Sequence, residues 1–243
     1  MTDPMRREAR EYTDRLREAL GERLRSVVLH GSVARGEAVE GVSDVNLLVL
    51  VDSVDPDLLV RLAPYARQWL EKERSLPLVL TWDEWRAASD AFAIETSDMV
   101  DAREVLAGDD PVAGAEVRRS DLRLQAEREL RGKLIHLREG TLAAADRPRE
   151  LGRLLLTALP SVATYLRAAL RLGGMGASAD TTGTLERGAK LVGIEPEPLL
   201  ELWALRGKRR VPEPDVGDEM VTAVHRVLER TAEYVDTWSG ETQ

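Results

Sequence analysis

The fold of this 243-residue chain is decided by residues 29–51, which read LHGSVARGEAVEGVSDVNLLVLV. An apolar, β-branched run over residues 26–30 stops at Gly31, and a second run covers residues 45–51. Both runs are typical of buried strands. Glycine lets a backbone approach a phosphate closely, and Ser32 adds a hydroxyl. A helix opening over residues 32–37 would point its first N–H groups at an anion. The stretch therefore predicts an anion site between two strands.

A candidate metal site follows at the second strand. Asp44 is expected at the start of this strand, with Asn46 two residues further. Side chains alternate along a strand, so both residues should lie on one face. Carboxylates on such a face could hold divalent metals beside a triphosphate. A buried Asn46 also needs polar partners, which favours a cleft at this face.

The stretch resembles the signature of the DNA polymerase β-like nucleotidyltransferase superfamily, in the branch of aminoglycoside nucleotidyltransferases and MNT-type domains. That signature is Gly-Ser followed, after an interval, by Asp-x-Asp inside an apolar strand. Gly31, Ser32 and Asp44 match it. The resemblance implies that Gly31, Ser32 and Arg35 bind a nucleoside triphosphate. It also implies that Asp44 and Asn46 are catalytic and ligate Mg or Mn.

Two departures put the metal site in doubt. The second acidic position of the signature is Asn46, and active relatives generally carry a third carboxylate on a later strand. The matching run here, residues 76–81, reads LPLVLT and has no acid. Two expectations follow. Either Asp83, Glu84 or Glu95 supplies the third metal ligand, or there is no third ligand and the site is degenerate.

The rest of the chain predicts an α/β domain followed by a helical one. Helices are expected over residues 4–20, 56–73 and 83–100, with a third strand over 76–81 and a short edge strand at 105–106. Beyond residue 114 only helical patterns follow, over 117–146, 149–172, 184–192, 196–206 and 216–238. Pro160 should kink or split the second of these. We predict a nucleotidyltransferase fold, a small mixed sheet flanked by helices, over 1–114, and an all-α helical bundle over 115–243.

Several site residues have simpler interpretations. Ser32 could be a helix N-cap, and Asp44 could close a turn before the strand. Arg35 could be a solvated helix residue. Asp83 and Glu84 could simply begin a helix, where negative charge is favourable.

Composition narrows the class of protein. The chain has a net charge of −9, so it repels nucleic acid unless it has a local basic face, and the main basic cluster, residues 208–210, is expected to be a solvated loop. It has no cysteine, which excludes disulfides and thiolate chemistry. No apolar run is long enough to span a membrane, and a charged N-terminus favours the cytoplasm. The sequence does not determine the oligomeric state, and a homodimer is one of the possible states.

Three functions remain. The first is transfer of a nucleoside monophosphate from a Mg-nucleoside triphosphate to a hydroxyl of a small acceptor, bound where the two domains meet. The second is a non-catalytic nucleotide-binding or partner protein of the same fold. The third is a HEPN-like RNase, because Arg131 and His136 have the Arg-x4-His spacing, which we expect to place them on one side of a helix.

Overall fold

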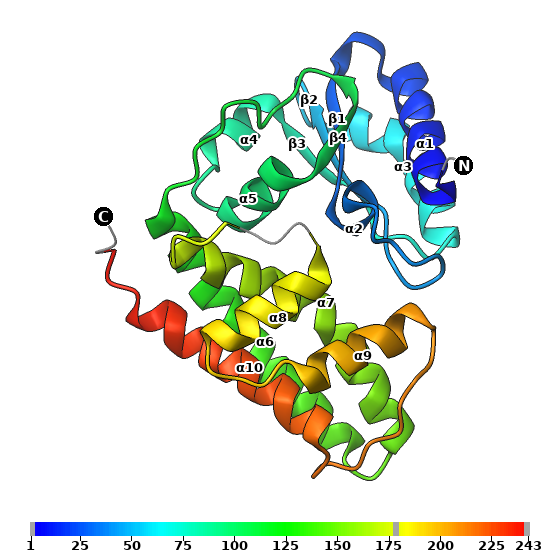
Figure 1. Cartoon of the computed structure of the whole chain (residues 1–243). Coiled ribbons are helices and arrows are strands. Elements are labelled where there is room, and N and C mark those ends of the chain that lie inside the picture. The colour runs from blue at the N-terminus through cyan, green and yellow to red at the C-terminus, as the bar shows by residue number, and fades with distance from the viewer. Residues whose placement is uncertain (1–2, 177–179, 241–243) are drawn as a thin grey trace. The chain divides into compact units, whose positions relative to one another are not determined.

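The structure is a computed structural model that describes residues 3–176 and 180–240. The chain divides into two compact units, Met1–Val117 and Arg118–Gln243. The first combines a sheet with helices and the second contains only helices among its described residues (Figure 1). This arrangement confirms the predicted fold class. No helix in the described part of the chain combines the length and apolarity that a membrane crossing requires.

The first unit is built on a four-stranded mixed sheet. Its strands are β1 (Leu24–His30), β2 (Asn46–Val51), β3 (Leu78–Thr81) and β4 (Arg103–Gly108), in the order β3-β2-β1-β4. Strand β1 is antiparallel to both β2 and β4, and β2 is parallel to β3. The register pairs His30 with both Asn46 and Arg103. The end of β1 and the starts of β2 and β4 therefore share one edge of the sheet.

Helices cover both faces of this sheet (Figure 1). Helices α1 (Pro4–Leu20) and α3 (Pro56–Glu71) bury an apolar stripe against one face, with Leu29 and Leu47 in that core. Asp3 caps α1 by accepting from the Met5 N–H, as the Asp-Pro sequence predicts. The opposite face packs Val28 and Leu48 against α4 (Trp82–Ala87) and α5 (Ala93–Asp101). A short helix, α2 (Gly31–Arg35), follows β1 directly.

The prediction of one helix over residues 83–100 is wrong. The chain turns between α4 and α5, where the Phe92 N–H donates to the Ala88 carbonyl. Trp85 and Phe92 stack at 5.7 Å, and Trp85 and Met99 share one core. A straight helix over 18 residues would be about 27 Å long, so it could not place both ends on this small core. Packing of aromatic residues overrides the local helical preference here.

The second unit is a bundle of α6 (Arg119–Ala144), α7 (Pro148–Leu172), α8 (Thr181–Leu191), α9 (Glu197–Gly207) and α10 (Glu219–Thr237). Helix α7 is its centre and packs against the other four. Pro160 does not split α7, which continues through it. The expected split is therefore absent, because the buried flanks of α7 hold both halves in one helix.

Candidate functional site

The Gly-Ser turn is formed by the end of β1 and the start of α2. Gly31 has a φ of 74°, a backbone conformation that residues with a Cβ atom rarely adopt. A Cβ at this position would lie 2.7 Å from the Nδ2 atom of Asn46. The turn therefore needs glycine twice, for its backbone conformation and for the amide packed over it. Gly31 and Asn46 are in contact, as the candidate site requires.

Ser32 and Arg35 lie on α2. The N-cap residue of α2 is His30, and no side chain caps this helix. The N-cap interpretation of Ser32 is therefore wrong, since the helix begins one residue earlier than the sequence indicates. Arg35 is not a solvated residue either. Its side chain is only 12% exposed, and its Nε atom lies 3.4 Å from Oε2 of Glu37.

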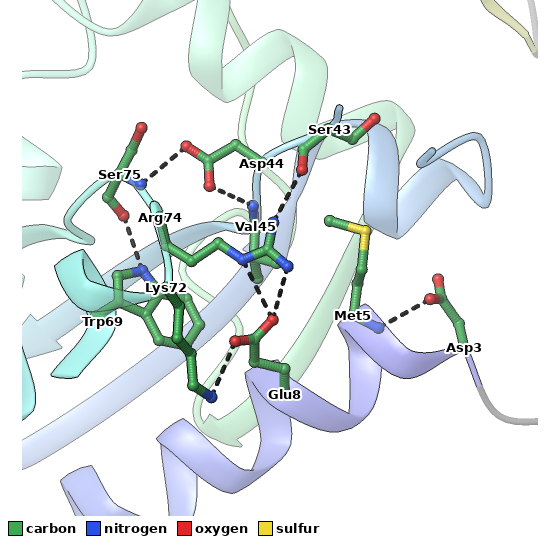
Figure 2. A network of polar contacts seen from close by, with 10 residues as sticks. All are labelled: Asp3, Met5, Glu8, Ser43, Asp44, Val45, Trp69, Lys72, Arg74 and Ser75. Carbon is green, nitrogen blue, oxygen red and sulfur yellow. Dashed lines mark hydrogen bonds and ion pairs between the residues drawn. The ribbon is translucent and has the colours of Figure 1, made fainter. Parts of the chain in front are cut away.

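Asp44 is held by two backbone amides. Its Oδ1 atom accepts from the Val45 N–H at 2.8 Å, and its Oδ2 atom accepts from the Ser75 N–H at 3.0 Å (Figure 2). Strand β2 begins only at Asn46, so Asp44 lies just before the strand rather than in it. The turn before the strand is closed by Ser43, whose N–H donates to the Val39 carbonyl and whose Oγ accepts from the Val39 N–H, so the turn-closing interpretation of Asp44 is wrong. The bond of Asp44 to Ser75 is made across 31 residues of chain.

His30 adds a titratable group beside these residues. Burial lowers the pKa of His30 from 6.5 to about 4; the negative charge of Asp98 raises this pKa and the positive charge of Arg35 lowers it. The imidazole is therefore neutral at pH 7. Asp98 is a buried residue of α5, with 9% of its surface exposed. The sequence offered no signal for Asp98, because its proximity to His30 comes from the packing of α5 on the sheet.

The acids considered as a third ligand have different positions. Glu84 belongs to a capping box with Thr81. Its Oε2 atom accepts from the Thr81 N–H at 2.7 Å, while Thr81 Oγ1 accepts from the Glu84 N–H. Asp83 is exposed in the same first turn, so both acids begin a helix, as the simpler interpretation expects. Glu95 is half-buried in the first turn of α5.

The residues present fit one divalent cation that arrives with a nucleotide. Each oxygen of Asp44 accepts one N–H and has a further lone pair for a metal. Magnesium is usually held by one or two carboxylates together with substrate phosphates. Over residues 3–176 and 180–240, no three His, Cys, Asp or Glu side chains form a group that could hold a metal alone. Phosphate oxygens would have to complete the ligand set of Asp44 and Asn46.

The pair Arg131 and His136 lies in α6. Five positions correspond to about 140° around an α-helix, so the two side chains leave different sides. Arg131 pairs with Glu127 at 3.2 Å and with Asp236 at 3.4 Å. The expectation that the spacing puts both residues on one side is therefore wrong, and we do not propose an RNase.

Part of the chain matches a known protein family. Residues 10–94 match the family described as nucleotidyltransferase domain. This match contains Gly31, Ser32, Asp44 and Asn46, and it confirms the resemblance for this part of the chain. A search of curated proteins found no match.

A solved structure shares the fold of both units. It is the crystal structure of spectinomycin adenyltransferase AAD(9) from Enterococcus faecialis with ATP and spectinomycin. The two chains are 12% identical with a TM-score of 0.60, and the match covers 95% of this chain and 99% of the other. At this identity the likeness concerns the fold.

Proposed function

We propose that this protein transfers a nucleoside monophosphate from a magnesium or manganese nucleoside triphosphate to a hydroxyl group of a small acceptor. The observation that best supports this proposal is the Asp44 carboxylate, which accepts hydrogen bonds from two backbone amides and lies within the part of the chain that matches the nucleotidyltransferase domain. The similar adenyltransferase fold, crystallised with ATP and an acceptor, supports the same reaction class.

Each residue has a stated task in this proposal. The backbone at Gly31 and Ser32 binds phosphate oxygens, because the first N–H groups of a helix have no partner within it. Arg35, which is largely buried beside Glu37, supplies positive charge near the phosphates. Asp44 and the amide oxygen of Asn46 hold the divalent cation, which supplies positive charge against the charge that develops on the phosphates.

The chemistry is a displacement at the α-phosphorus. The acceptor oxygen forms a bond to this phosphorus, the bond to the bridging oxygen breaks, and pyrophosphate leaves. The proton of the acceptor hydroxyl passes to solvent. A single carboxylate on the metal predicts weaker metal binding than in a site with three, so the reaction should need millimolar metal or manganese in place of magnesium.

Calorimetry tests this proposal. The purified protein is titrated with ATP, GTP, CTP and UTP, each with and without magnesium or manganese, alongside the Asp44→Ala variant. We expect binding that depends on metal and is lost in Asp44→Ala. A screen of hydroxyl acceptors for pyrophosphate release follows. Equal binding or equal transfer by Asp44→Ala would show that the assignment of this residue is wrong.

A second candidate is a nucleotide-binding protein without turnover. Asn46 favours it, because it stands where the resemblance implies an acid, and so does the acid-free strand β3. This function predicts metal-dependent nucleotide binding with no pyrophosphate release for any hydroxyl acceptor. Release with any acceptor, if it is lost in Asp44→Ala, excludes this second function.

A further inference from the structure

The loop that follows α3 carries an ion pair beside Asp44. Arg74 donates from Nη2 and Nε to Oε2 of Glu8 on α1, at 2.9 and 3.2 Å (Figure 2). Both side chains are 15% exposed. Arg74 also donates from Nη1 to the Ser43 carbonyl at 3.0 Å. One guanidinium therefore ties α1 to the residue directly before Asp44.

The residue after Arg74 completes the arrangement. The Ser75 N–H donates to Oδ2 of Asp44, and the Ser75 carbonyl accepts from Nε1 of Trp69 at 2.8 Å. Trp69 is 2% exposed, so its indole is a fixed support. The Arg74-Ser75 dipeptide thus binds the backbone before Asp44 through one residue and the Asp44 carboxylate through the other.

The backbone of this loop is held in an uncommon conformation. Helix α3 ends with the Arg74 N–H bonded to the Trp69 carbonyl and the Glu73 N–H bonded to the Leu70 carbonyl. Glycine usually occupies the left-handed position of such a motif, but here Glu73 does so with a φ of 57°. Strained conformations of this kind persist only where the surroundings enforce them. The helix-ending hydrogen bonds hold Glu73 itself, and the contacts of Arg74 and Ser75 hold the two residues that follow it.

We propose that Glu8 and Arg74 are positioning residues, which fix the Asp44 carboxylate in the place where it ligates the metal of the bound nucleotide. The inference rests on the proposed function, because it assigns a support to the ligand named there. In this proposal both residues act through the loop and not by binding nucleotide or metal themselves. Their pair holds the loop, the loop holds the carboxylate, and the buried charges of both side chains neutralise each other.

The structure provides a matched control for this pair. Lys72 also pairs with Glu8, with its Nζ atom 3.0 Å from Oε1, but it is 50% exposed and makes none of the hydrogen bonds that the described residues show for Ser43 and Asp44. Replacing Lys72 removes a cation from Glu8 and leaves the support of Asp44 in place. Replacing Arg74 removes a cation and the support together. Lys72→Gln and Arg74→Gln therefore separate general charge loss from positioning.

Two measurements on the full-length protein test the proposal. The first measurement is the hydrogen-exchange rate, by NMR, of the Val45 and Ser75 amides, which donate hydrogen bonds to Asp44. Calorimetry follows the affinity for manganese-ATP. In Arg74→Gln we expect exchange of both amides to rise by about tenfold or more, and affinity to fall by about tenfold or more. In Lys72→Gln we expect both quantities to stay at the wild-type value. If Arg74→Gln does not fold, the single variants Arg74→Lys and Glu8→Gln are measured in its place.

Three outcomes would overturn the positioning role. These are unchanged amide exchange in Arg74→Gln, faster exchange with unchanged manganese-ATP affinity, and equal losses in Arg74→Gln and Lys72→Gln. A different result, no metal-dependent nucleotide binding by the wild-type protein, counts against the proposed function. In that case amide exchange alone decides whether Arg74 holds the Asp44 carboxylate.

Discussion

Replacing Asn46 by aspartate should strengthen metal binding at the proposed site. Asn46 begins β2 beside His30 in the register, and its amide packs over Gly31. Aspartate has nearly the same shape, so the variant adds a charge without a new clash. The position is half-buried, which limits screening by water.

The expected gain follows from the charge. A unit negative charge about 4 Å from a positive one contributes about 4 kcal/mol at an effective dielectric of about 20. That energy corresponds to about a thousandfold in affinity. In the proposed site the asparagine oxygen already provides part of this interaction, so the thousandfold figure is a ceiling. We expect the affinity for manganese-ATP to rise between about tenfold and about a thousandfold.

The assay is calorimetry of wild type, Asn46→Asp, and Asn46→Asp combined with Asp44→Asn. The double variant has the wild-type number of carboxylates, so it should lose most of the gain. NMR titration of His30 gives an independent readout, because a carboxylate opposite this residue must raise its pKa from about 4. A raised His30 pKa with unchanged manganese-ATP affinity would show that the side chain at position 46 does not ligate the metal.

Three further predictions concern neighbouring residues. Gly31→Ala and Gly36→Ala should each cost about 1–2 kcal/mol of unfolding free energy, because both glycines have a φ near 75° (74° and 76°). Only Gly31→Ala should also weaken metal-dependent nucleotide binding, since its Cβ displaces the Asn46 amide, whereas Gly36 faces open space; equal binding by both variants would contradict this. The contribution of His30 to the unfolding free energy should be complete above pH 6.5 and fall by on the order of 3 kcal/mol towards pH 4. In this pH range the unfolded chain binds a proton at His30, whereas the buried imidazole of the folded chain stays neutral. Chemical denaturation across this range should show a smaller fall in His30→Gln, and identical slopes would refute the assignment. Glu84→Gln should leave both stability and manganese-ATP affinity unchanged, because glutamine also completes a capping box; a tenfold loss of affinity would instead identify Glu84 as the third ligand.

Local signals predicted much of the first unit. The apolar runs at residues 26–30 and 45–51 became β1 and β2, and Asp3-Pro4 began α1. These strands and this helix start were predictable because alternation, capping and apolar periodicity are patterns among residues close together in the sequence. The same kind of signal failed at Ala88–Phe92, where a stack between two aromatic residues ends one helix and starts another.

The amino-acid sequence was enough to predict the Gly-Ser turn and the absence of an acid at position 46. It also placed Asp44 close to the second strand, although that strand begins only at Asn46. These are properties of adjacent residues and of their spacing. The support of Asp44 comes from tertiary packing, because Glu8 and Arg74 are separated by 66 residues and Asp44 and Ser75 by 31. The burial of His30 near Asp98 has the same origin. Contacts of this kind come from the packing of helices on a sheet, and no local pattern in the chain records which distant residues that packing brings together.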